Sequence, residues 1–229
     1  VMSATERLAA ASAFLRAADL LEAVAPVVEG PLRGKVLDQL ARLYERAGDL
    51  ARALDTLLAL AGDTPAAAPP ELVARLAGAY LRGGEPAEAR RLAESACERL
   101  APAPAELLAI AAEGAYGSGD LDAAAQLAEQ VPGSAGRPAL TARNTRGKVL
   151  LVRESLDDAE ALFAANLEAV AALGAADHQA RALINLGVVH LQRGEADAAL
   201  GRFEAARDLC TRTGDVRNLA IAVENLAVL

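Results

Sequence analysis

The stretch LINLGVVHLQRGEADAALGRFEAA, residues 183–206, determines the fold. Two apolar segments with helical spacing flank a polar turn at Arg193-Gly194-Glu195. Glycine ends a helix at little cost because it readily adopts the left-handed conformation. The acid that follows caps free N–H groups and favours the positive end of the next helix dipole. The stretch therefore predicts two antiparallel helices joined by a tight turn.

The turn recurs along the chain at a regular interval. Successive acids, or the residues in their place, are 30, 36, 35, 35 and 40 residues apart. This period fits a unit of two helices, each about four turns long. The turns are Ala18-Asp19, Gly48-Asp49, Gly84-Glu85, Gly119-Asp120, Glu154-Ser155 and Gly194-Glu195, of which the first and fifth are degenerate.

Two columns of the aligned units hold only small residues. Small residues lie where two helices cross, since a larger side chain would push the axes apart. Seven residues before the turn stand Ala41, Ala77, Ala112, Gly147 and Gly187. Five after the turn Gly stand Ala53, Ala89, Ala124, Ala159 and Ala199. The pattern predicts closely packed helix pairs.

These units resemble the tetratricopeptide repeat, and residues 183–206 match that family's pattern at nearly every defining column. The resemblance implies an all-α, right-handed α-solenoid of about six helix–turn–helix repeats and about 13 antiparallel helices. We expect one domain over residues 1–229. Its units are expected at about 3–30, 32–62, 70–101, 104–132, 138–174 and 177–213, with a partial unit at 215–229.

Composition limits the possible functions. The formal charge is −8, from 23 Lys+Arg and 31 Asp+Glu, which disfavours binding to nucleic acid. No apolar run approaches the roughly 20 residues of a membrane span. No catalytic constellation, cofactor motif or Cys/His metal cluster is found, so we expect no enzyme activity. His190 occupies a packed column, whereas His178, near a helix start, is expected to be solvated.

The expected binding surface is the concave side, which the first helix of each unit lines. Asn185 and Asn225 occupy equivalent places and Asn144 lies one residue off register, so their amides could hold an extended peptide backbone. The alternative is that each Asn bonds within its own helix pair or to solvent. Lys148 and Arg181, with Arg143 and Arg146, could form a basic area, or a solvated mixture of charges. The further groove candidates are Lys35 and Arg42.

The leading functional hypothesis is a non-catalytic scaffold that binds a partner peptide or domain in its groove. A second is a sensor region of a bacterial transcriptional regulator or kinase, because the forty-residue units resemble signalling-type arrays. It would bind a small ligand or its own effector domain. A third is a structural spacer.

The ends of the chain suggest how it assembles and where it acts. The chain begins Val-Met and ends within a repeat, so we expect a fragment of a larger protein. No signal peptide opens the chain, so we expect a cytoplasmic location. Residues 225–229 would leave a core face uncovered, so a homodimer could form through that end.

Overall fold

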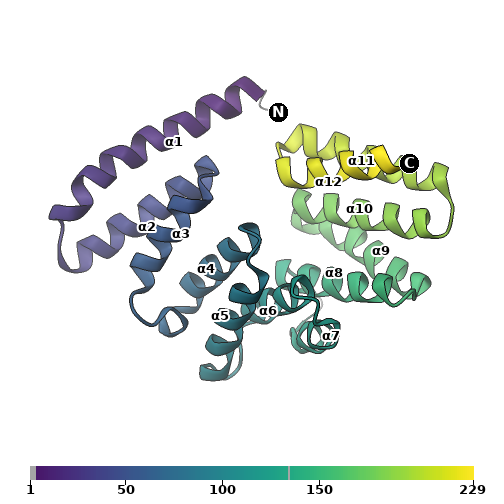
Figure 1. The fold of residues 1–229 in the computed structure, drawn as a ribbon, viewed down its shortest axis with the longest axis horizontal. Coiled ribbons are helices and arrows are strands. Elements are labelled where there is room, and N and C mark those ends of the chain that lie inside the picture. Colours follow the sequence, from purple (N-terminus) through teal and green to yellow (C-terminus); the bar gives the residue numbers. More distant parts are fainter. Residues whose placement is uncertain (1–3, 134) are drawn as a thin grey trace. The chain divides into compact units, whose positions relative to one another are not determined.

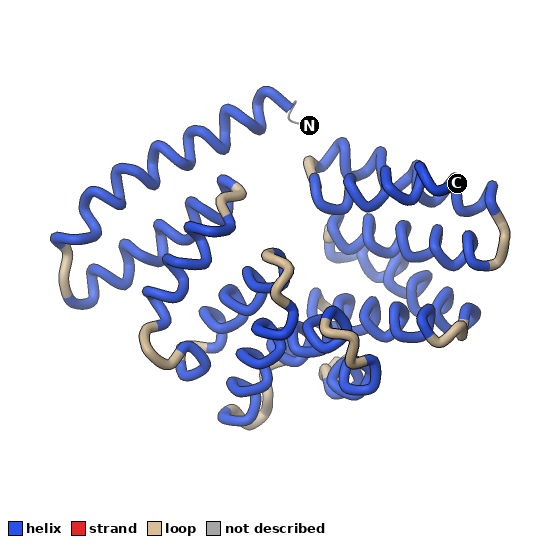
Figure 2. Tube along the Cα trace, in the orientation of Figure 1, coloured by secondary structure: helices blue, strands red, loops and turns tan. Residues whose placement is uncertain are grey.

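The computed structural model describes residues 4–133 and 135–229. Within these residues the chain is all α-helical, with twelve α-helices and no strand (Figures 1 and 2). The helices form two compact units, and the chain passes from one to the other between Ser118 and Gly119. The all-α fold expected from the sequence is confirmed.

In the N-terminal unit, consecutive helices pack against one another, α1 on α2, α2 on α3 and so on to α5 on α6. Its α-helices are α1 (Ala4–Val24), α2 (Gly30–Ala47), α3 (Leu50–Ala61), α4 (Pro70–Arg82), α5 (Pro86–Arg99) and α6 (Ala105–Gly117). Two short 3₁₀ helices, η1 (Ala25–Val27) and η2 (Pro65–Ala67), lie between them.

Consecutive helices also pack against one another in the C-terminal unit. Here the first helices of successive repeats are in contact as well, α8 with α10 and α10 with α12. Its helices are α7 (Leu121–Gln130), α8 (Arg137–Val152), α9 (Leu156–Leu173), α10 (Ala176–Gln192), α11 (Ala196–Thr213) and α12 (Val216–Val228).

The predicted turns have left-handed backbone conformation. Gly48, Gly84, Gly119 and Gly194 have φ between 77° and 83°. Glu154, which replaces Gly in the degenerate turn, has φ of 61° and is the only non-glycine with positive φ among the described residues. The register of the repeats is therefore kept at a position where an L side chain is strained.

Whether the acid after a turn caps the next helix depends on the length of its side chain. Asp49 accepts a hydrogen bond from the backbone N of Arg52 at 3.2 Å, and Asp120 accepts one from Ala123 at 3.0 Å. Glu85 and Glu195 begin their helices without a side-chain cap, because a longer side chain does not fold back as readily onto the first turn. The predicted capping thus holds for Asp and was wrong for Glu.

The small columns lie at the helix crossings. All five Ala residues of the second column have no exposed surface. A Cβ placed on Gly147 would lie 2.4 Å from Cε1 of Phe163, and one on Gly187 would lie 2.4 Å from Cε1 of Phe203. In both pairs the aromatic ring thus occupies the space that a side chain on the glycine would need.

The turn expected at Ala18-Asp19 was wrong, because α1 runs unbroken through both residues. The segment has no Gly to end a helix and is rich in Ala and Leu, which favour helix continuation. This leaves one helix where two were expected and accounts for twelve helices rather than about thirteen. The expected start of that unit, residue 3, lies outside the described residues.

Candidate protein-binding site

The predicted site residues lie on the first helices of their repeats, in both compact units. Asn144 and Lys148 lie on α8, Arg181 and Asn185 on α10, and Asn225 on α12. Lys35 and Arg42 lie on α2, in the other unit, and are considered with that unit below. The four residues on α8 and α10, two helices that pack together, are called the α8–α10 face.

Two of the three asparagines are joined. Nδ2 of Asn185 donates a hydrogen bond to Oδ1 of Asn144, with a distance of 2.7 Å between the two atoms. Asn144 is only 4% exposed, whereas Asn185 is half-buried. Asn144 therefore orients the Asn185 amide, and Asn185 presents the more accessible surface.

Asn225 is not bonded to this pair. Its Nδ2 donates to the backbone O of Ile221, one turn earlier in α12, at 2.8 Å. The residue of α10 that corresponds to Asn144 is Ile184, which has no polar atom in its side chain. The asparagines of the described residues therefore do not form a continuous chain of hydrogen bonds, because Ile184 offers no partner to Asn225.

The same two repeat positions form an ion pair in the N-terminal unit. Asp38 stands ten residues before its turn, as Asn144 does, and Arg75 stands nine before the next turn, as Asn185 does. The Arg75 guanidinium contacts the Asp38 carboxylate and lies 2.8 Å from the Glu45 carboxylate. These carboxylates hold the pKa of Arg75 above its usual value, although burial acts in the opposite direction.

The N-terminal candidates lie beside this cluster of one guanidinium and two carboxylates. Arg42 is exposed and its Nε lies 3.1 Å from Asp38. Lys35 is exposed about two turns before Arg42 on α2. The pairing of Arg75 with Asp38 and Glu45 was not predicted from the sequence. The position of Arg75 could have predicted it, because Arg75 stands nine residues before its turn and faces an acid in the preceding repeat.

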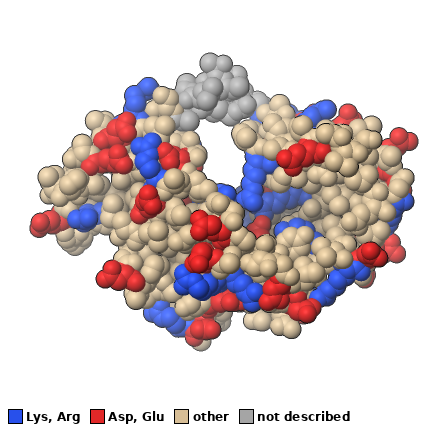
Figure 3. Space-filling model, in the orientation of Figure 1, with Lys and Arg blue, Asp and Glu red and all other residues tan. Residues whose placement is uncertain are grey.

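Charge is segregated between α8 and α9. Helix α8 carries Arg137, Arg143, Arg146 and Lys148 and no acid, although the whole chain is acidic. Its partner α9 carries four acids and no basic residue. Figure 3 shows basic side chains gathered over the C-terminal unit near α8 and α10. The positive charge therefore lies on the same helix as Asn144.

The basic residues of α8 differ in what holds them. Nη1 of Arg143 donates to Oδ1 of Asn166 at 2.8 Å, and Nδ2 of this buried asparagine donates to the backbone O of Leu140 at 2.9 Å. Arg143 thus links α8 to α9. The Arg146 side chain is 43% exposed and lies 3.7 Å from Glu129 of α7. Lys148 and Arg181 are half-buried and also have partners.

Both histidines lie on α10 and are largely buried. His190 is packed and its Nδ1 lies 2.6 Å from Oε2 of Glu195, as expected for a hydrogen-bonded core histidine. His178 is only 6% exposed, so its expected solvation was wrong. It lies inside the first turn of α10, where the unit packs around it.

Across the described residues, His, Cys, Asp and Glu side chains form no group of three or more that could hold a metal ion. None of the described helices combines the length and apolarity that a membrane crossing needs.

Comparison with known proteins supports the same family. Residues 138–228 match the family model of the tetratricopeptide repeat. This stretch includes every helix of the C-terminal unit that bears a predicted site residue. No curated protein matches the chain.

Several solved structures share the fold. The tetratricopeptide repeat protein TTC0263 of Thermus thermophilus is 18% identical, with 85% of this chain and 97% of that chain covered and a TM-score of 0.64. A tetratricopeptide repeat protein from Parabacteroides merdae is 15% identical, with 92% of each chain covered and a TM-score of 0.59. At these identities the likeness establishes the solenoid fold and nothing about ligands.

Proposed function

We propose that this chain, whose residues 138–228 belong to the tetratricopeptide repeat family, is a non-catalytic scaffold that binds an acidic segment of a protein partner on its α8–α10 face. The observation that carries the proposal is the charge of α8, which has four basic residues and no acid within a chain of net charge −8. A helix of one sign in a chain of the other favours a partner of complementary charge.

The Asn144–Asn185 pair supports a peptide as the partner. A side-chain amide both donates and accepts, so it can bond to the N–H and C=O of an extended backbone. Asn185 is already held by Asn144, so little side-chain freedom would be lost when it binds. Lys148 and Arg181 would contribute charge on either side of this amide, while Lys35 and Arg42 would form a separate contact region on α2.

The test is a quantitative pull-down from lysate of the source cell, with wild type compared with Lys148→Glu/Arg181→Glu. A control, Arg202→Glu/Arg212→Glu, makes the same charge change on α11. We expect an acidic partner to be recovered by wild type and control and lost by the α8–α10 variant. Equal recovery by all three proteins would refute binding on this face.

The sensor alternative has one observation in its favour, an apolar pocket in the N-terminal unit, and it is developed below. We keep the cytoplasmic location as a prediction. We also expect no binding to nucleic acid, because the helices that precede and follow α8 in the chain both carry acidic residues.

Self-association through α12 is a further part of the proposal. Val216 and Val228 are 71% and 73% exposed, and Val223 is 48% exposed. Covering such residues would favour a homodimer at high concentration. Sedimentation analysis should give a mass that rises with concentration in wild type and stays monomeric in Val223→Lys. A monomer at every concentration in wild type would refute the dimer.

A further inference from the structure

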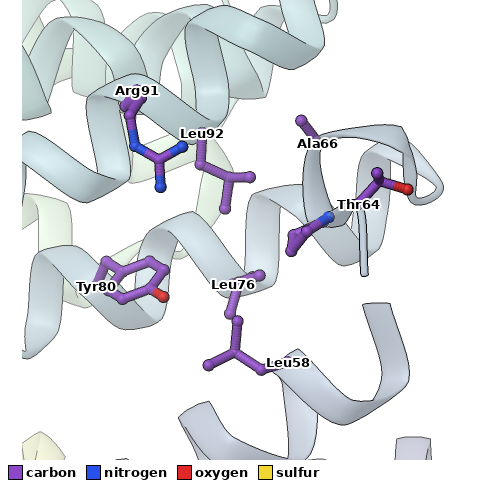
Figure 4. A pocket seen from close by; sticks show the side chains of 8 residues that line it. Leu58, Thr64, Ala66, Leu76, Tyr80, Arg91 and Leu92 are labelled. Atoms are coloured by element: carbon purple, nitrogen blue, oxygen red, sulfur yellow. The ribbon is translucent and has the colours of Figure 1, made fainter. Parts of the chain in front are cut away.

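A pocket of about 180 Å³ lies within the N-terminal unit, between α3, η2, α4 and α5. Figure 4 shows its lining side chains, which come from all four elements. The residues are Leu58, Thr64, Pro65, Ala66, Leu76, Tyr80, Arg91 and Leu92.

The linker between α3 and α4, which joins two successive repeats, forms part of this pocket. The linker of residues 62–69 between α3 and α4 contains η2, which packs against both α3 and α5. Nη1 of Arg99, in the last turn of α5, donates to the backbone O of Ala66 at 2.7 Å and holds η2 in place. The linker therefore forms one wall of the pocket instead of filling it.

Most of the lining is aliphatic. Leu58, Leu76 and Leu92 form the inner part, with Pro65 and Ala66 on the η2 side. An apolar cavity of roughly 150 Å³ stays dry and binds a molecule the size of benzene. The pocket thus has room for a ligand of about six to eight non-hydrogen atoms.

Two polar groups border the leucines. In Figure 4 the Tyr80 hydroxyl and the Arg91 guanidinium both point toward the apolar lining from one side. Burial raises the pKa of Tyr80, and the Glu85 and Glu88 carboxylates add to this, so its hydroxyl remains a donor at neutral pH. Arg91 lies 2.6 Å from Glu88 and is 73% exposed, so its guanidinium sits at the mouth.

We propose that this pocket binds a small aliphatic carboxylic acid, with the carbon chain among the three leucines and the carboxylate at Arg91 and Tyr80. Pockets of this kind are apolar, with few polar groups that fix orientation. Nε and Nη2 of Arg91 donate to the Glu88 carboxylate, so the outer N–H groups of this guanidinium are the ones offered to a ligand carboxylate, and the Tyr80 phenol adds a further donor. This binding does not depend on the α8–α10 face, which lies in the other unit.

The experiment uses 3-methylbutanoate, whose seven non-hydrogen atoms suit the volume, and follows the methyl signals of leucine by NMR. We expect the Leu58, Leu76 and Leu92 signals to shift with a dissociation constant on the order of 1 mM, since so small a ligand gains little binding energy. The uncharged 3-methylbutan-1-ol should bind at least about tenfold more weakly, because it cannot form the charge-assisted hydrogen bonds.

Three variants complete the test. Ala66→Leu fills the pocket and should abolish the shifts, whereas Arg91→Gln should reduce affinity for the acid to that for the alcohol. Arg212→Gln, exposed on α11, is the charge-matched control and should bind as wild type does. No shift at tens of millimolar acid, or equal binding of acid and alcohol, would overturn the proposal. Unchanged binding by Arg91→Gln would also overturn it, and this exposed substitution leaves the core intact.

Discussion

Asn185 donates a hydrogen bond to Asn144 from the place in the repeat at which Arg75 contacts Asp38. In both cases the residue nine before one turn reaches the residue ten before the preceding turn. The repeat geometry therefore brings these two positions together, and the residues that occupy them determine the type of contact. In the N-terminal unit the contact is an ion pair, whereas in the C-terminal unit it is a hydrogen bond that holds an amide next to basic residues.

The first prediction concerns this pair. A double-mutant cycle of Asn144→Ala and Asn185→Ala should give a coupling free energy of about 0.5–1.5 kcal/mol in urea unfolding, the net worth of one hydrogen bond. The matched cycle of Asn185→Ala with Asn225→Ala should give a value near zero, because Asn225 bonds within α12. Similar coupling in both cycles would show that the asparagines interact in some other arrangement.

The second prediction concerns the close approach of α10 and α11. Gly187→Ala should destabilise the protein by about 1–3 kcal/mol, because the new Cβ would overlap the Phe203 ring. Gly201→Ala, also within a helix but with no atom within 4 Å of its Cβ, should stabilise it by about 0.5–1 kcal/mol. Urea midpoints compare the two. Stabilisation by both changes would contradict the packing described for α10.

The third prediction concerns the degenerate turn. Glu154→Gly should raise the free energy of unfolding by about 0.5–1 kcal/mol, since relief of the left-handed strain exceeds the added freedom of the unfolded chain. The reverse change at an equivalent turn, Gly194→Ala, should lower it by about 1 kcal/mol. A loss of stability in Glu154→Gly would mean that the glutamate side chain stabilises the turn.

The fourth prediction concerns alkaline pH. Burial raises the pKa of Tyr44 to about 12, and the nearby Glu22 carboxylate acts in the same direction. Between pH 10 and 12 the unfolded state loses this proton while the folded state keeps it. Stability therefore falls as pH rises, by at most about 1.4 kcal/mol per pH unit from this group.

Tyr44→Phe should remove that part of the slope, measured by urea unfolding at pH 9 and pH 11. At pH 7 the variant should be within about 1 kcal/mol of wild type, because the buried Tyr44 hydroxyl makes no hydrogen bond of ordinary length and angle among the described residues, although it lies near the Glu22 carboxylate. Parallel declines for the two proteins above pH 10 would argue against the raised pKa.

Much of the fold could be predicted because the repeat places residues of one size at each crossing. The Ala column from Ala53 to Ala199 and the left-handed Glu154 follow from alignment alone. The unbroken helix at Ala18-Asp19 was missed, since a weak match to a turn does not outweigh strong helix propensity.

The site was harder to predict because it depends on contacts between neighbouring repeats. Asn144 lies one residue out of register with Asn185, yet the stagger of neighbouring helices brings their amides together. Asn225 is in register and lacks the bond because the opposing residue is Ile184. The η2 wall of the pocket arises from a Pro- and Ala-rich linker whose path no periodicity specifies.

The central claim, partner binding on the α8–α10 face, is tested most directly by hydrogen–deuterium exchange with and without the protein recovered by pull-down. The account predicts added protection in peptides of α8 and α10, and little change in α9 and α11. Lys148→Glu/Arg181→Glu should remove this protection. Protection confined to α9, α11 or the N-terminal unit would contradict the claim.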